Sequence, residues 1–304
     1  MKTVLLTLAL FIFLLLIFVG CSGDTPPPET TMSDIDITII TPQAPEELSP
    51  QDLLVAHFIS VGDGDAILLV QGYYAMLIDG GPPDMGTRVF QYLRAEGITA
   101  LEYVVATHPF ADHVGGLTDV LRRINVNTVL LPMIYHDTPA YNNFLQVVEE
   151  SGAAVIAPFA SETFTLGDAV ITVLAPSPTD EWEHRANYSI VMRVEFGQTS
   201  LLLMGDAMRE VENNLLNSDI ALSADVLKVA RHGASSATTR GFLDAVTPSI
   251  AVISAGRNSD FLSNDVLRRL EDVPAHVFRT DLHGNIRITS DGVRLSVVVE
   301  QEGR

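Results

Sequence analysis

The chain has 304 residues, of which 47% are hydrophobic, and this is enough to bury the core of one large domain or two small ones. Its formal net charge is -20, and Lys2 and Lys228 are the only lysines among its 18 basic residues. This charge balance argues against strong nucleic acid binding over a broad basic surface, although smaller local basic patches are still compatible with it.

The N-terminus predicts a bacterial lipoprotein signal. Residues 4–19 form one apolar run after Lys2, a little short of the roughly 18 residues that a spanning helix needs. The run ends in FVGCSGD, where Gly20 precedes Cys21, the only cysteine, and this resembles a lipobox, although Phe18 stands where Leu is preferred. We interpret residues 1–21 as a signal peptide that ends at the lipidated cysteine, with an uncut signal anchor as the alternative. Both interpretations place the rest of the chain outside the cytoplasm, in the first case lipid-anchored to the bacterial membrane.

A linker and one domain are expected next. Residues 22–52 are rich in Pro, Thr and acidic side chains, which favour extended, solvated backbone. Within them, IDITII at 35–40 can pair as an edge strand. No second linker follows, so we expect residues 53–304 to form a single domain.

Strands and helices alternate through this domain. Strands at 53–62, 65–72 and 73–81 are separated by glycine turns, which predicts an antiparallel meander. Gly197-Gln198 predicts a tight hairpin. The further predicted strands are 101–106, 127–132, 153–158, 169–176, 188–197, 199–205, 224–230, 249–254, 275–279, 284–289 and 293–299, and the predicted helices are 86–96, 114–123, 139–150, 208–217, 239–245 and 262–271. This mixture predicts a layered α/β fold with mixed sheets.

Polar side chains that are candidates for a functional site follow four of the apolar strands. They are Asp79 after YYAMLI, His108, Asp112 and His113 after YVVAT, Asp206 after SLLLMG, and Arg231 and His232 after DVLKVA. Loops at strand ends can meet at one rim of a sheet, where carboxylates that gather would repel one another unless a cation lay among them. Imidazole and carboxylate ligands suit zinc, with manganese or iron as alternatives. Asp112 and His113 can also be read simply as a capped helix start.

Eight blocks in order resemble the metallo-β-lactamase fold superfamily, and in particular the extracellular domain of the ComEC/Rec2 DNA-uptake proteins. They are FISVGDGDAILL (58–69), MLIDGG (76–81), THPFADHVGGL (107–117), NYSIVMRVEFG (187–197), LLLMGD (201–206), DVLKVARHG (225–233), PSIAVISAG (248–256) and RTDLHGNI (279–286). The resemblance implies a four-layer αββα sandwich with its site at one rim. We interpret VGDGD at 61–65 as a tight polar turn, and we assign no chemical role to RTDLHG.

The resemblance also implies the metal ligands. In the superfamily, an H-x-H-x-D-H motif and a later bridging Asp build two adjacent metal positions. His108, Asp112 and His113 match this motif, Asp206 matches the bridge, His232 matches a ligand in an H-H-G block, and Asp79 matches an Asp that organises the site.

Three positions depart from this pattern. Phe110 replaces the second His of the motif, Arg231 replaces the first His of the H-H-G block, and Asn187 stands where many members have a further His, although the uptake proteins are similar in having Asn there. We therefore expect one metal, most readily zinc, held by Asp112, His113, Asp206 and His232. His184 is a lesser candidate for replacing the missing histidine.

The resemblance favours a hydrolase of phosphodiester or other ester bonds, with a small molecule or nucleotide as substrate and a membrane anchor as its other partner. His108 is expected to orient water or shuttle a proton. Arg231 is expected either to pair with Asp206 or to grip a substrate phosphate, or else to be a plain surface arginine. The alternative function is a catalytically inactive ComEC-like binding domain linked to competence or to nucleic acid handling at the cell surface.

Overall fold

The central strands are buried on both faces, which explains why they appear in the sequence as nearly continuous apolar runs. β2 (Leu54–Phe58), β3 (Ile67–Gln71) and β4 (Tyr74–Ile78) form the predicted antiparallel meander. β10 (Val191–Phe196) and β11 (Thr199–Leu203) form the predicted hairpin, with Phe196 paired to Thr199 across the Gly197-Gln198 turn. Local turn chemistry therefore sets the register of both motifs.

The computed structural model describes residues 38–39 and 49–301, so the predicted signal peptide, lipid anchor and most of the linker lie outside the described residues. β1 (Thr38–Ile39) falls within the predicted edge strand and pairs in parallel with β16 (Leu295–Val299). The sheet thus begins before the predicted start of the domain at residue 53. In the described part of the chain, no helix is both long and apolar enough to cross a bilayer.

The strands form two mixed sheets. The nine-stranded sheet has the order β1-β16-β15-β2-β3-β4-β5-β6-β7, and the seven-stranded sheet has the order β14-β13-β12-β11-β10-β9-β8. The strands β4 to β7 run parallel in the first sheet, as do β11 to β14 in the second. The remaining bounds are β5 (Ala100–Val105), β6 (Asn125–Leu130), β7 (Ala154–Ile156), β8 (Thr163–Leu166), β9 (Ala169–Ala175), β12 (Val226–Lys228), β13 (Ile250–Ile253), β14 (His276–Arg279) and β15 (Ile286–Ser290).

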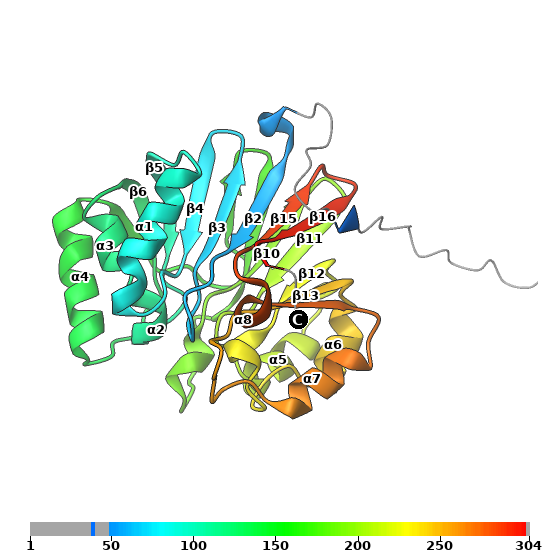
Figure 1. Ribbon diagram of the computed structural model, residues 1–304. Coiled ribbons are helices and arrows are strands. Elements are labelled where there is room, and N and C mark those ends of the chain that lie inside the picture. The colour runs from blue at the N-terminus through cyan, green and yellow to red at the C-terminus, as the bar shows by residue number, and fades with distance from the viewer. Residues whose placement is uncertain (1–37, 40–48, 302–304) are drawn as a thin grey trace, which may run out of the picture. The chain divides into compact units, whose positions relative to one another are not determined.

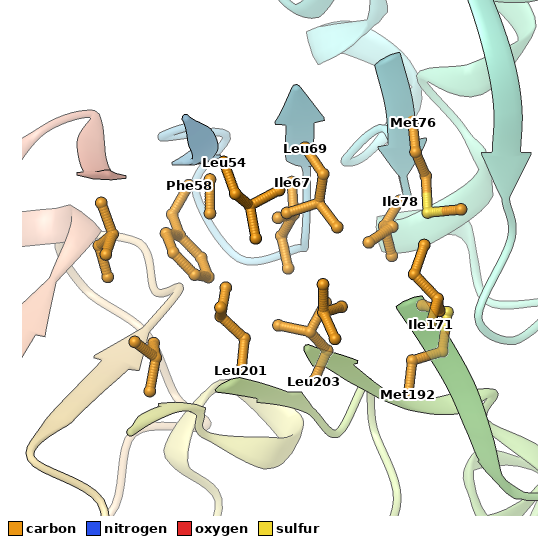
Figure 2. Close-up of a cluster of buried hydrophobic side chains, with 14 of the residues drawn as sticks. Leu54, Phe58, Ile67, Leu69, Met76, Ile78, Ile171, Met192, Leu201 and Leu203 are labelled. Carbon is orange, nitrogen blue, oxygen red and sulfur yellow. The ribbon is translucent and has the colours of Figure 1, made fainter. Parts of the chain in front are cut away.

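Helices cover the outer face of each sheet, which gives the expected four-layer sandwich (Figure 1). The nine-stranded sheet packs against α1 (Gly86–Ala95), α3 (Leu117–Leu121) and α4 (Pro139–Ser151), and the seven-stranded sheet packs against α5 (Arg209–Leu216), α6 (Arg240–Val246) and α7 (Asn264–Glu271). Between the sheets, Phe58 and Leu69 face Leu201 and Leu203 in a core of aliphatic and aromatic side chains (Figure 2). Three apolar layers thus hold the four layers of the fold together.

Some elements differ from the sequence prediction. The helix predicted at 114–123 is two short helices, α2 (Ala111–Val114) and α3, which are separated by Gly115 and Gly116. The strand β8 was not predicted because TFTL is short and half exposed, and it pairs with β9 in an antiparallel ladder. RTDLHG forms α8 (Thr280–His283), which joins β14 of one sheet to β15 of the other. This block therefore has a connecting role.

His57 makes the stability of the fold depend on pH. It is buried on β2, its Nδ1 lies 3.0 Å from the Tyr92 hydroxyl, and burial together with Arg287 lowers its pKa to about 3. Because this folded-state pKa lies below the ordinary value of 6.5, protons favour the unfolded chain, and the stability that is present above pH 6.5 is lost as the pH falls towards 3.

Replacing His57 with Gln should therefore flatten the pH dependence of the free energy of unfolding. We expect the loss between pH 7 and pH 5, measured by urea denaturation, to be smaller than in the wild type by roughly 2 kcal/mol. The matched control is His276→Gln, which removes an exposed histidine from β14. Equal pH dependence in the two variants would contradict the assignment.

Candidate metal centre

The candidate residues gather at the carboxyl ends of parallel strands. Asp79 directly follows β4, His108 follows β5, Asp206 follows β11 and His232 follows β12. β4 and β5 are parallel neighbours, and so are β11 and β12, so each pair of loops leaves its sheet at the same edge. The structure thus brings side chains from both sheets to one rim, as the order of motifs predicts.

Close glycine contacts place α2 at this rim. The Gly80 N–H donates to the His113 carbonyl at 2.8 Å, and the Gly116 N–H donates to the Gly81 carbonyl at 2.9 Å. A Cβ on Gly116 would lie 1.9 Å from the Gly80 oxygen, so no side chain fits there. The glycines of LIDGG and HVGG therefore allow the backbone contact that positions His113.

The turn at 61–65 is part of the same assembly. The Asp65 N–H donates to the Asp112 carbonyl at 3.3 Å, and the Asp65 carbonyl accepts from the Gly81 N–H at 2.8 Å. A Cβ on Gly64, whose φ is +153°, would lie 2.4 Å from the Asp112 oxygen. The turn thus lies directly against the metal-binding motif.

His232 reaches the site from a strained turn. Arg231 and His232 have φ values of +49° and +54°, which are uncommon for residues other than glycine. The Arg231 N–H donates to the Gly205 carbonyl at 3.0 Å, so this turn is tied to the loop that carries Asp206. Backbone strain of about 1–3 kcal/mol per residue persists where the surrounding structure holds it, commonly at functional sites.

Four side chains have the spacing of ligands around one ion. Asp112, His113, Asp206 and His232 are the set that the resemblance implies. The distances are 3.5 Å from His113 Nε2 to Asp206 Oδ1, 3.6 Å from His232 Nε2 to Asp206 Oδ1, 3.6 Å from His232 Nε2 to Asp112 Oδ2 and 3.9 Å from His113 Nε2 to Asp112 Oδ2. Donor atoms of a tetrahedral zinc ion lie roughly 3.3–3.6 Å apart. Asp112, His113 and His232 form a group whose ligand atoms all lie within 4.8 Å of one another, and Asp206 Oδ1 lies next to both imidazoles, so these side chains have the donor atoms to hold a divalent cation.

These ligand atoms also lack hydrogen bonds. His113 and His232 are completely buried and Asp206 is 3% exposed, yet His113 Nε2, His232 Nε2 and Asp206 Oδ1 have no hydrogen-bond partner among the described residues. Buried polar atoms are costly unless they are paired, and a cation would pair all three at once. Asp112, with a side chain 27% exposed, is the ligand that faces solvent.

Outer partners fix the tautomer of each histidine. His113 Nδ1 donates to Asp79 Oδ2 at 2.7 Å and His232 Nδ1 donates to the Ser254 carbonyl at 3.2 Å. Thr107 Oγ1 donates to Asp79 Oδ2 at 2.7 Å, so it can accept from His108 Nδ1 at 3.1 Å. Each Nε2 therefore keeps a lone pair for the site, and Asp79 orients ligands without binding the ion itself.

Mutual charges set the protonation of the cluster. Burial alone would lower the pKa of His113, but the Asp79 and Asp206 carboxylates raise it well above its ordinary value. Burial would raise the pKa of Asp206, but His113 and His232 hold it well below its ordinary value. Burial and the neighbouring His113 lower the pKa of His108. Against the effect of burial, the carboxylates of Asp206, Asp112 and Asp65 also raise the pKa of His232. Both His113 and His232 must therefore give up a proton at Nε2 before they can bind a cation, whereas the lowered pKa of His108 keeps it neutral.

At the other metal position that the resemblance implies, two of the expected histidines are Phe110 and Asn187. His108 Nε2 lies 3.5 Å from Asp206 Oδ2, but the Phe110 ring, 4.8 Å from the His108 ring between centroids, has no donor atom. Asn187 is already engaged, since its Nδ2 donates to Glu210 Oε2 at 3.1 Å and its Oδ1 accepts from the Met208 N–H at 2.9 Å. The His184 ring packs edge-on against Phe110 with centroids 6.2 Å apart.

His108, His113 and Asp206 also form a group whose ligand atoms lie within 4.8 Å of one another. His113 Nε2 is common to this group and to the four-ligand set, and it can bind only one ion. Asp112, His113 and His232 form a second group of this kind, so the two groups are alternatives, and the resemblance favours the one with Asp112 and His232.

Arg231 lies beside the site. Its guanidinium donates to Met208 Sδ at 2.6 Å and to Ser236 Oγ at 3.2 Å. Within residues 49–301, no ion pair joins it to Asp206, so the structure gives no support to that arm of the sequence hypothesis. The Arg231 charge also helps to lower the pKa of His184, after burial, which places the guanidinium on the His184 side of the site.

Sequence reasoning missed two charged residues next to the ligands. Asp65 was read as part of a structural turn and Lys228 as one of two lysines, yet both are completely buried or nearly so, and their side chains form an ion pair of 2.8 Å. An available signal was the lysine itself, since it directly precedes the V-A-R-H segment in an otherwise lysine-poor chain.

Residues 59–257 match the family model described as the Metallo-beta-lactamase superfamily. The chain belongs to this superfamily. It is 29% identical over 249 residues to ComE operon protein 3 of Bacillus subtilis, which covers 75% of this chain and 32% of that protein. It is 27% identical over 246 residues to Recombination protein 2 of Haemophilus influenzae, and the match covers 79% of this chain and 29% of that protein.

The fold agrees with a solved member. The metallo-beta-lactamase fold protein YhfI from Bacillus subtilis superposes with a TM-score of 0.51 at 16% identity, covering 75% of this chain and 95% of that one. The predicted superfamily, its ComEC-type branch and the sandwich fold are thus confirmed. The chain spans about a third of the length of the curated relatives it matches.

Replacing Gly116 with Ala should disrupt the site through the backbone. We expect a loss of about 3 kcal/mol or more in the free energy of unfolding, because the new Cβ would overlap the Gly80 oxygen. Gly241→Ala on α6, where the nearest atom to a new Cβ is 3.9 Å away, is the matched control. Similar urea midpoints for the two variants would show that the contact is not restrictive.

Proposed function

We propose that the chain is a metal-dependent hydrolase of phosphodiester or other ester bonds, tethered outside the cytoplasm by a lipid on Cys21 and working with one bound cation. The observation that carries this proposal is the convergence of Asp112, His113, Asp206 and His232 at ligand spacing, with three of their donor atoms buried and unpartnered. Superfamily membership and the sequence of the N-terminus support the remaining parts.

Zinc suits the four ligands best, and manganese is the alternative. Imidazole nitrogens are borderline donors and carboxylate oxygens are hard donors, a mixture that both zinc and manganese accept, and the site has no thiolate. When bound, such a cation polarises an ester or phosphoryl oxygen and lowers the pKa of a coordinated water towards about 7.

His108 is proposed to move the proton. Its Nδ1 is held by Thr107, its Nε2 is buried without a partner in the described part of the chain, and burial together with His113 lowers its pKa. A neutral imidazole in this orientation can accept a proton at Nε2 from an attacking water and return it to the leaving group.

The charges of the site favour one ion together with Arg231. Four carboxylates, those of Asp65, Asp79, Asp112 and Asp206, face one ammonium and one guanidinium, which leaves two negative charges. One divalent cation neutralises them, so an anionic substrate is not repelled and Arg231 can bind its phosphate through two N–H groups. Loss of the second ion removes the two-metal clamp, so we expect slower turnover than two metals would give.

The second candidate function is a binding domain that retains the fold without catalysis. Phe110 favours it, because this side chain removes a ligand from the site. The curated relatives, named for competence and recombination, suggest a role in nucleic acid handling, whereas the net charge of -20 argues against strong binding to DNA.

Metal analysis of the purified full chain tests the proposal. We expect one equivalent of zinc or manganese per chain and turnover of a chromogenic phosphodiester. Asp206→Ala and His232→Ala should lose both, because each removes a ligand, whereas His108→Ala should keep the metal and lose turnover by about 100-fold or more. Folded, metal-free and inert protein would favour the binding domain.

Arg231 can be tested separately. We expect Arg231→Ala to lower kcat/KM for bis(p-nitrophenyl) phosphate by roughly 10- to 100-fold, the effect of losing a charge-assisted contact, and Arg231→Lys to recover only part of it. Hydrolysis of the uncharged p-nitrophenyl acetate serves as the control and should change little. Phosphodiester rates that equal the wild-type rate in both the Ala and Lys variants would remove Arg231 from the mechanism.

A further inference from the structure

Lys228 and Asp65 form a buried ion pair between the two sheets. Lys228 ends β12 of the seven-stranded sheet, and Asp65 lies just before β3 of the nine-stranded sheet. Lys228 Nζ donates to Asp65 Oδ2 at 2.8 Å and to the Val229 carbonyl at 3.1 Å. The exposed fractions are 0% for Lys228 and 1% for Asp65, so neither charge is solvated.

Asp65 reaches the metal ligands with its other oxygen. Its Oδ1 has no hydrogen-bond partner among the described residues and lies 3.8 Å from His232 Nδ1. One oxygen of Asp65 lies within 4.8 Å of ligand atoms of Asp206 and His232, and one lies within that distance of Asp79 and His113. The carboxylate is therefore at ligand range from the centre, without belonging to the four-ligand set.

Stability alone does not explain the pair. A buried ion pair is costly to desolvate, and apolar residues of similar volume often serve the fold equally well. A pair that only joined the sheets would also leave no reason for Oδ1 to be unpaired. One oxygen of Asp65 binds Lys228 and the other lies beside His232. This position indicates that the pair has a role at the metal centre.

We propose that the Lys228–Asp65 pair tunes the charge and the ligand number of the centre. Lys228 acts as a positioning residue: by binding Oδ2 it holds the carboxylate back from the cation and offsets its negative charge. Asp65 in turn adds attraction for the cation from beside Asp206 and His232. This inference rests on the proposed function, because it requires that the four-ligand set binds a metal.

The two members of the pair should then have opposite effects on metal affinity. Lys228→Met frees an uncompensated carboxylate, so cobalt(II) should bind about tenfold more tightly or better, and Asp65 should join as a further ligand. Asp65→Asn leaves an unpaired ammonium near the ion, so cobalt(II) should bind about tenfold more weakly or worse. The double variant should return close to the wild-type affinity.

The experiment is a cobalt(II) titration of the full chain followed by visible absorption, with folding monitored by circular dichroism. Extra coordination in Lys228→Met should weaken and shift the bands of the bound ion, whereas Asp65→Asn should keep their shape. Asp291→Asn and Arg294→Met, which make the same charge changes in the β15–β16 turn, are the matched controls. That turn contacts the start of the β10–β11 hairpin through Gln198, at the end of β11 opposite Asp206.

The outcomes separate the two proposals. Absence of cobalt binding by the wild type would contradict the proposed function itself. Binding by the wild type with the same direction of change in both single variants would overturn the tuning role and leave a structural pair. If Lys228→Met does not fold, Lys228→Gln, which keeps a donor for Asp65 Oδ2 but no charge, should still bind cobalt(II) more tightly than the wild type, and weaker binding would contradict the proposal.

Discussion

The arrangement of this domain depends on polar atoms that are buried together and not hydrogen bonded. In the described part of the chain, three imidazole nitrogens and one oxygen of Asp206, from loops of both sheets, are buried without a hydrogen-bond partner. Such a cluster costs free energy unless something pairs with it, and outer partners such as Asp79 and Ser254 keep the lone pairs pointing inward. The glycine contacts, the strained turn at His232 and the buried ion pair all serve to hold these atoms in place.

Phe110 and Arg231 are related changes. Phe110 offers no ligand atom beside His108, and the Arg231 guanidinium lies at Met208 and Ser236, where it carries a fixed positive charge close to the loop of Asp206. A guanidinium is always charged, so its positive charge does not depend on binding a metal ion. Unlike a metal ion, it does not lower the pKa of a bound water. Under the proposed function, one exchangeable ion and one fixed guanidinium would together receive an anion, without the symmetric clamp that two ions provide.

The sequence predicted the superfamily and the layers, because these depend on apolar patterning and on short motifs whose residues are neighbours in the chain. The four-ligand set stays a prediction, and the structure places its members, from three distant loops, at one rim. The sequence did not predict that the helix after His113 breaks at Gly115 and Gly116, since the reason is contact with Gly80, over thirty residues away. The role of Asp65 was missed for the same reason. Its partner, Lys228, is 163 residues further along the chain, and a polar turn looks alike whether or not a charge lies opposite.

The burial of Lys228 also determines how the folded domain reacts with reagents that modify lysine side chains. Lys2 is the only other lysine, so the described part of the chain holds a single side-chain amine, and that amine has no exposed surface. Acylating reagents and lysine-directed crosslinkers find no target on the folded domain. An acyl group on Lys228 would record a moment at which the two sheets had separated at their shared rim, so that slow labelling at this residue measures the opening of the molecule.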